Sequence, residues 1–229
     1  MCYCIKYKVG IMEILKRILN IFTPRKSGTP QFVDLGLPSG LKWAKCNVGA
    51  KKETDYGYYF QWGDIVDKRK SNRGWKRYRH CKGIKYTLTK YCRYLLHGTV
   101  TDKSTLDPED DAATQIMGGG WRMPTLDEIQ ELLDNTDKEW IKDYNGTGVN
   151  GRKFTSRTDT SKYIFIPAAG YCLDGSMYGV GTYGDVWSSS LNTSYPYNAW
   201  GLHFSAGKYN IDYNSRYYSL PVRAVKEKN

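Results

Sequence analysis

The stretch from residue 194 to residue 220 carries the side chains best suited to recognition chemistry. Tyrosine recurs there beside asparagine, serine, aspartate and histidine, while glutamate, glutamine and methionine are absent. Tyrosine offers a large, stiff and half-polar contact surface, and small polar residues add adaptable hydrogen bonds. This composition predicts non-covalent binding of a ligand. The candidate ligand-binding residues are Tyr195, Tyr197, Asn198, His203, Ser205, Asn210, Asp212, Tyr213, Asn214, Tyr217 and Tyr218.

Residue types that catalyse reactions or bind metals are present, but their spacing matches no known pattern. The three histidines, His80, His97 and His203, are scattered along the chain. His80 and His97 flank Cys81 and Cys92, and this spacing is wrong for the common zinc sites. We therefore expect no catalytic residue, no metal and no cofactor.

Acids crowd residues 107–111, where calcium binding and helix capping are alternative interpretations. The four carboxylates lack the alternating spacing of a known calcium loop. Asp107 can instead cap a helix, with Pro108 at its first position and the other acids near its positive end. Capping is the interpretation that the pattern favours.

The six cysteines have irregular spacing, which favours free thiols in a reducing compartment over disulfides. They are Cys2, Cys4, Cys46, Cys81, Cys92 and Cys172.

The net charge of +11 is concentrated in two segments. Residues 1–30 contribute +5 and residues 68–93 contribute +11, so the rest of the chain carries −5. In residues 68–93, Lys and Arg alternate with Trp75, Tyr78 and Tyr86, a mixture that could hold a nucleic-acid backbone and stack bases. No recognised nucleic-acid motif frames this segment. We therefore expect a solvated basic insertion and do not favour nucleic acid as a partner.

The first thirty residues precede the expected main domain. Residues 11–22 place apolar side chains at helical spacing, which suits contact with a membrane surface, docking on a partner or packing on the protein's own domain. Residues 23–30 contain two prolines and a glycine, as is typical of a linker. No segment has the roughly 18 apolar residues of a membrane span, and we see no secretory or lipoprotein signal.

The rest of the chain must hold the C-terminal stretch in place, and its pattern favours strands with few helices. Thr125 followed by Glu128 is a capping box, and the apolar spacing after it predicts a helix from about residue 126 to 134. After Gly146, apolar residues alternate with polar ones at the period of a β-strand.

The C-terminal stretch itself predicts a β-hairpin. Trp200, Leu202 and Phe204 alternate with small or polar residues, and the tyrosines and Ile211 of the following run do the same. This alternation predicts one buried face and one open face.

Eight motifs in the chain together resemble one known family. In order they are VDLGLPSGLKWAKCNVGA, YGYYFQWGD, YTLTKYC, LDPEDDAA, GGGWRMPTLDEIQELL, IFIPAAGY, VWSSSLNTSYPYNAWGLHF and YYSLPVRAV. They resemble the Fibrobacter-type major paralogous domain, which is abundant in proteins of gut Bacteroidetes, over roughly residues 31–225. That family is related to the C-type lectin fold, in the branch that resembles the formylglycine-generating enzyme.

The resemblance implies an α+β domain with a C-type lectin-like fold. Such a fold has paired terminal strands, one or two short helices and a C-terminal β-hairpin as its ligand face. We therefore expect an N-terminal amphipathic segment and linker in residues 1–30 and a C-type lectin-like domain in residues 31–226. The basic insertion at residues 68–93 lies outside the family pattern.

The resemblance also implies a function, because some members are the variable proteins of diversity-generating retroelements. In those, a reverse transcriptase rewrites adenines near the 3′ end of the gene, and the changed residues form a binding surface. An AAC codon rewritten at its adenines never encodes Lys, Glu, Gln, Met or Trp. Between Ser194 and Leu220, only Trp200 and Lys208 fall outside the accessible set. Trp200 is accordingly expected to be a fixed core residue, and Lys208 a fixed turn residue.

The implied protein is a non-catalytic binder displaying a tyrosine-rich, retroelement-diversified surface. Its expected ligand is a protein or glycan on a cell or virus surface, and its expected place is a cell surface or a phage particle. An oxidase of the formylglycine-generating class is the enzymatic alternative. That chemistry would need a cysteine pair near the C-terminal strands, where Cys172 stands alone. Nucleic-acid binding through the basic insertion is the other alternative.

Overall fold

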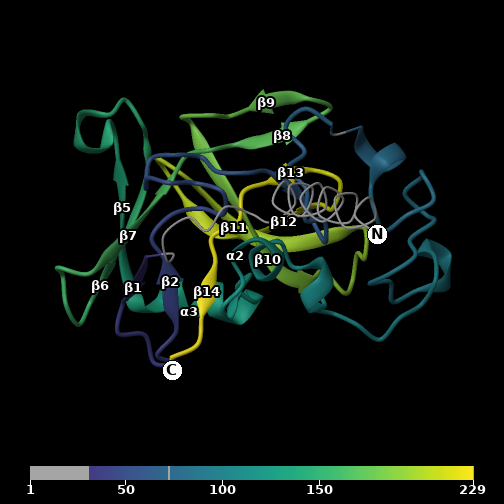
Figure 1. Ribbon diagram of the computed structural model, residues 1–229, viewed down its shortest axis with the longest axis horizontal. Helices are drawn as coiled ribbons and strands as arrows, with labels where there is room; N and C mark the ends of the chain where they lie inside the picture. The colour runs from purple at the N-terminus through teal and green to yellow at the C-terminus, as the bar shows by residue number, and fades with distance from the viewer. Residues whose placement is uncertain (1–30, 72, 229) are drawn as a thin grey trace, which may run out of the picture. The chain divides into compact units, whose positions relative to one another are not determined.

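The computed structural model describes residues 31–71 and 73–228 (Figure 1). The chain divides into two units, Met1–Pro30 and Gln31–Asn229. The helix and linker predicted in residues 11–30 lie outside the described residues.

Short antiparallel strands make up most of the regular structure, and they form four sheets. The first sheet has the order β1 (Phe32–Asp34), β2 (Lys42–Ala44), β14 (Val225–Lys226) and β4 (Trp121–Arg122). The second has the order β10 (Tyr183–Leu191), β11 (Asn198–Ser205) and β12 (Tyr209–Ser215). The third has the order β3 (Phe60–Gln61), β13 (Ser219–Leu220), β8 (Tyr171–Leu173) and β9 (Ser176–Tyr178). The fourth has the order β5 (Thr136–Ile141), β6 (Gly151–Ser156) and β7 (Tyr163–Pro167).

The expected α+β class with a C-type lectin-like fold is wrong, because the described part of the chain is mostly β-sheet. Its helices are α2 (Ala112–Met117), α3 (Leu126–Asn135) and the 3-10 turns η1 (Gly74–Arg77), η2 (Leu95–His97), η3 (Pro108–Asp110) and η4 (Tyr144–Gly146). Most apolar residues follow the two-residue period of strands, so only brief segments favour a helix. The first and last strands share a sheet, but β2 separates β1 from β14.

Helix α3 begins where the capping box predicts. The Thr125 hydroxyl accepts a hydrogen bond from the Glu128 backbone N–H at 3.3 Å, and the Glu128 carboxylate accepts one from the Thr125 N–H at 2.8 Å. The helix buries Ile129, Leu132 and Leu133. The prediction of a helix near residues 126–134 is therefore confirmed.

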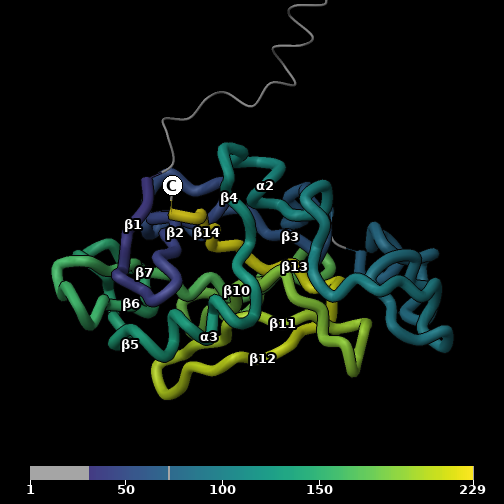
Figure 2. The backbone as a smooth tube through the Cα atoms, turned by 90° about the horizontal axis from the view of Figure 1, so that it is seen from below, coloured from purple at the N-terminus to yellow at the C-terminus, as the bar shows by residue number. Residues whose placement is uncertain are grey.

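The sheet β10–β11–β12 lies between two hydrophobic cores, and α3 lies beside it (Figure 2). Leu202 and Phe204 pack with α3 on one face, whereas Trp187 and Ala199 pack into the other core on the opposite face. The predicted hairpin is present, and its polar face is partly exposed, although Ala199 and Gly201 on that face are buried. Trp200, expected in the core, is only half-buried.

The basic insertion is anchored on the main domain by the buried side chain of Arg216. Its guanidinium donates to the Tyr78 hydroxyl at 2.7 Å and to the carbonyl oxygens of Tyr91 and Pro196 at 3.0 and 2.9 Å. Tyr78, Leu88 and Cys92 form a small core of their own. Most Lys and Arg side chains of the insertion are exposed, as expected of a solvated insertion, but its aromatic and apolar residues fold the segment onto the main domain.

Candidate functional site

The hairpin β11–β12 places its polar candidate residues in one row. Its two strands are joined by residues 206–208, and His203 pairs with Asn210 across the ladder. Because side chains alternate between faces, five candidates share the face opposite Leu202 and Phe204. They are His203, Ser205, Asn210, Asp212 and Asn214. All five are partly exposed.

Stacked tyrosines continue this row beyond the hairpin. We call them the tyrosine cluster; its members are Tyr171, Tyr178, Tyr183, Tyr217 and Tyr218. The Tyr171 ring lies 5.0 Å from the Tyr218 ring and 5.2 Å from the Tyr178 ring, nearly parallel to both. The Tyr183 ring lies 5.7 Å from the His203 imidazole. Three strand pairs therefore contribute to one polar and aromatic surface.

Gly170 lets the strands that carry this cluster approach one another. Its φ is +56°, and a Cβ there would lie 1.9 Å from the Tyr178 carbonyl oxygen. Its N–H donates to the Tyr183 carbonyl at 2.9 Å. A larger residue would force the backbone apart, so the glycine sets the spacing of the tyrosines on either side.

The hydrogen-bonding groups of this surface are neutral phenols and an oriented imidazole. Burial raises the pKa of Tyr183 and of Tyr217 to about 12, so both hydroxyls remain protonated at neutral pH. The His203 Nδ1 lies 2.9 Å from an Asp185 carboxylate oxygen, which fixes the orientation of the ring. The Asn210 side-chain oxygen is buried and has no partner among the described residues.

Three further candidates gather on the other side of the hairpin, near the basic insertion. Tyr213 packs edge-on against Trp200 at 5.4 Å, and Tyr195 lies 6.3 Å from Tyr213. Tyr197 contacts the ring of His97 at 5.4 Å. The eleven candidates therefore do not form one continuous row.

Asn198 is not available to a ligand. It is buried at the start of β11, where the Ser215 hydroxyl donates to its side-chain oxygen at 3.2 Å.

Sequence reasoning missed Tyr171, Tyr178 and Tyr183 as parts of the surface. Tyr171 closes the motif IFIPAAGY, and Tyr183 starts a strand of alternating pattern. Those signals indicate strands, whereas the stacking that joins them to Tyr218 arises only in the folded chain.

Within the described residues, one group brings three potential metal-ligand atoms together, namely Asp107, Glu109 and Asp110. The Lys90 ammonium lies 2.6 Å from both Asp107 and Asp110 and 3.1 Å from Glu109. Lys103 lies 2.6 Å from Asp107 and Arg79 lies 3.2 Å from Asp110, so cations of the protein itself pair with this cluster. Asp107 lies at the N-cap of η3 with Pro108 directly after it, as predicted, but its side chain makes no capping hydrogen bond; the Asp111 side chain caps α2.

The cysteines and histidines considered for zinc do not converge. The Cys81 thiol donates to the Trp75 carbonyl and the Cys92 thiol to the Tyr94 carbonyl. Cys46, Cys81 and Cys92 are free thiols. Burial raises the pKa of Cys172, which is the opposite of what a reactive thiolate needs.

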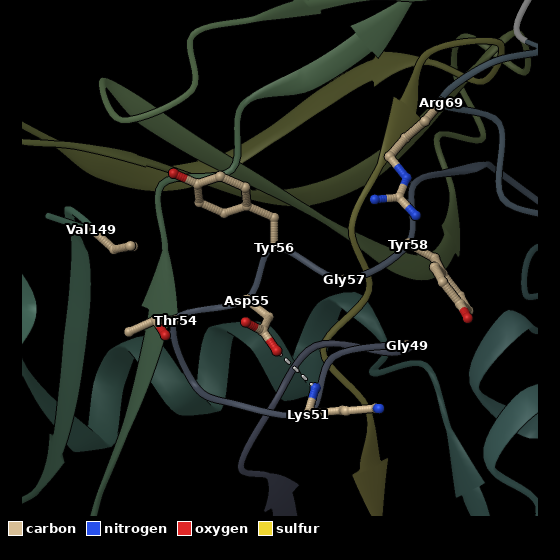
Figure 3. Close-up of a pocket in the computed structure, with 9 residues that line it drawn as sticks. All are labelled: Gly49, Lys51, Thr54, Asp55, Tyr56, Gly57, Tyr58, Arg69 and Val149. Atoms are coloured by element: carbon tan, nitrogen blue, oxygen red, sulfur yellow. Dashed lines mark hydrogen bonds between the residues drawn. The ribbon is translucent and has the colours of Figure 1, made fainter. Parts of the chain in front are cut away.

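A surface pocket lies away from the hairpin, beside the loop that follows β2 (Figure 3). It is lined by Gly49, Lys51, Thr54, Asp55, Tyr56, Gly57, Tyr58, Arg69 and Val149. The Asp55 carboxylate already accepts from the backbone N–H groups of Lys51 and Lys52. Arg69 is paired with Asp67. The charges of Asp55 and Arg69 are thus engaged within the protein, and the pocket shares no lining residue with the hairpin or the tyrosine cluster.

A family model described as the Lcl C-terminal domain matches residues 36–226. The chain belongs to this family. Membership in the Lcl C-terminal domain family fits a ligand-binding protein of the variable type. Neither the curated proteins nor the solved structures contain a significant match. No helix among the described residues is both long and apolar enough to span a bilayer.

Proposed function

We propose that this member of the Lcl C-terminal domain family is a non-catalytic binding protein. Its ligand face consists of the tyrosine cluster and the polar row of the hairpin. The observation that carries this proposal is the continuous contact from His203 through Tyr183 and Tyr171 to Tyr218. Strands hold His203, Tyr183 and Tyr171, and Tyr218 lies directly before β13 and stacks on Tyr171, so little conformational entropy is lost when a ligand binds.

The chemistry of the face suits a protein or glycan ligand on a cell or virus surface. Stacked phenol rings offer flat apolar area to a sugar ring or an aromatic side chain. Their hydroxyl groups, with Asp212 and His203, offer both donors and acceptors. The tyrosine-rich composition matches that of adaptable paratopes, where rigid aromatic residues and small polar residues work together.

We further propose that the polar row is diversified by a retroelement. His203, Ser205, Asn210, Asp212 and Asn214 are all encoded within the set reached from a rewritten AAC codon, and they share one face. In contrast, Phe204 lies between His203 and Ser205 but packs in a core on the opposite face. The core residue Trp187 lies on β10, outside the polar row.

The diversification proposal predicts a specific arrangement in the genome. We expect a near-copy of the last ~100 nucleotides of this gene that differs only at adenines, beside a reverse-transcriptase gene. Sequencing the genomic neighbourhood provides the test. A neighbourhood with neither element would contradict diversification while leaving the binding proposal standing.

The binding proposal predicts that single tyrosines carry much of the affinity. On an array of glycans and surface proteins, we expect Tyr178→Ala or Tyr218→Ala to weaken the strongest interaction about 30-fold, since aromatic anchors at an interface contribute about 2 kcal/mol or more. Tyr209→Ala is the matched control, because Tyr209 lies on the same hairpin but on the opposite face. Equal losses for Tyr209→Ala and Tyr178→Ala, with all variants folded by circular dichroism, would exclude the tyrosine cluster as the ligand face.

A further inference from the structure

A turn inside the basic insertion and the 3-10 turn η2, which follows the insertion directly, expose aliphatic side chains next to one another. Leu95 is 84% exposed, Leu96 79% and Ile84 62%. Tyr86 and Tyr94 are about half exposed beside them. We call these five residues the apolar tip. Consecutive leucines with this exposure are unusual on a surface that contacts only water.

The fold holds the two turns side by side. In the first turn, the Thr87 N–H and hydroxyl both donate to the Ile84 carbonyl, at 3.1 and 2.7 Å. The second turn is η2, and the backbone of the buried Leu88 bonds to both His97 and Thr99. The rings of Tyr86 and His97 stack at 5.4 Å. Hydrogen bonds and ring stacking therefore fix the position of the apolar tip in the fold.

Close approach of the backbone at Gly98 supports the same conclusion. Its φ is +140°, and a Cβ there would lie 2.1 Å from the Leu88 carbonyl oxygen. Glycine at this position lets η2 fold back against Leu88, which directs Leu95 and Leu96 outward from the paired turns.

Positive charge surrounds the apolar tip. Lys82 and Arg93 are exposed and Lys85 is half-buried, and none of the three forms an ion pair with a described residue. No acidic residue occurs between Lys68 and Arg93. The exposed Asp102 is the first carboxylate after η2 along the chain. The insertion lies at one end of the described unit, away from α3 (Figures 1 and 2).

We propose that this tip docks on an anionic lipid membrane. Leucine and isoleucine side chains enter the edge of the hydrocarbon, tyrosines lie at the level of the headgroups, and Lys and Arg attract anionic lipids. A nucleic acid fits less well, because its phosphates and bases gain nothing from exposed leucines and the Tyr86 ring is already stacked. The apolar tip shares no residue with the tyrosine cluster.

The test uses the full chain and sedimentation with vesicles of phosphatidylglycerol and phosphatidylcholine. We expect binding to these vesicles that falls as salt rises, and little binding to vesicles of phosphatidylcholine alone. Replacing both leucines, Leu95→Ser with Leu96→Ser, should lower the ratio of bound to free protein at least about tenfold. Lys82→Gln should lower it about fivefold.

The matched control is Phe32→Ser with Val66→Ser, two exposed apolar residues outside the insertion. It should bind like the unaltered protein. Unchanged binding of the double leucine variant would overturn the proposal and indicate another contact, such as residues 11–22. Absence of vesicle binding would also overturn it, as would salt-sensitive binding of duplex DNA by the same segment without any binding of vesicles.

Discussion

Replacing Arg216 with methionine is expected to lower the free energy of unfolding by at least about 4 kcal/mol. The methionine can fill much of the same space, but it leaves buried acceptors without donors. Each such group costs about 1–3 kcal/mol, and Arg216 serves the Tyr78 hydroxyl and the carbonyl oxygens of Tyr91, Pro196 and Lys90. Chemical denaturation provides the measurement.

The same variant should open the basic insertion to proteases. Arg216 lies over the rings of Trp62 and Tyr78, at 4.8 and 5.1 Å, so it joins the insertion to the main core. Without it, trypsin should cleave among the eleven Lys and Arg residues of residues 68–93 well before the rest of the domain. The neighbouring Tyr217 and Tyr218 should lose their fixed positions at the same time.

Arg157→Met is the matched control for this prediction. Arg157 is an exposed arginine paired with Asp137 at 3.1 Å, and exposed ion pairs contribute about 0–1 kcal/mol. We expect its denaturation curve and its proteolysis pattern to stay close to those of the unaltered protein. If Arg216→Met behaved like Arg157→Met, Arg216 would not be the anchor of the insertion.

The role of Arg216 could not be predicted from sequence. It follows Ser215 in a polar strand, where an arginine is normally an exposed side chain. Its carbonyl partner Tyr91 is 125 positions away. In contrast, α3 was predictable because Thr125 and Glu128 act within one turn, and local patterns report local structure.

The candidate surface was predictable only in part, for a related reason. The two-residue period identifies which hairpin residues share a face, but it does not say what covers that face. Trp187 and Ala199 are buried on the same face, so only the polar residues of β12 and the end near His203 are partly exposed there. Tyr171 joins that end through stacking between sheets, which no local pattern encodes.

Acid is expected to destabilise the domain through His80. Burial is the main cause that lowers the pKa of His80 to about 4, while the Asp110 carboxylate opposes this effect and Arg216 and Arg79 add to it. The ring packs edge-on against Tyr78 and Tyr91, and its Nε2 donates to the Gly63 carbonyl at 3.0 Å. An unfolded histidine has a pKa near 6.5.

The direction of the effect follows from these two pKa values. Below about pH 6.5 the unfolded chain takes up a proton at His80 that the folded chain refuses, so acid favours unfolding. The difference between the folded and unfolded pKa values of His80 corresponds to about 3 kcal/mol of stability, at 1.36 kcal/mol per pKa unit. Above pH 6.5, we expect the contribution of His80 to the free energy of unfolding to stay constant. As the pH falls towards 4, that contribution should decrease by about this amount.

His80→Gln isolates this contribution, because glutamine keeps an N–H donor and does not titrate. Urea denaturation of both proteins between pH 7.5 and pH 4 provides the measurement, and the variant should lose less stability over that range. Comparing the two proteins cancels the carboxyl groups that both retain, such as Asp111, whose pKa burial raises. Parallel pH profiles would mean that His80 accepts a proton without penalty in the fold. The aromatic packing around it would then be looser than the contacts with Tyr78 and Tyr91 require.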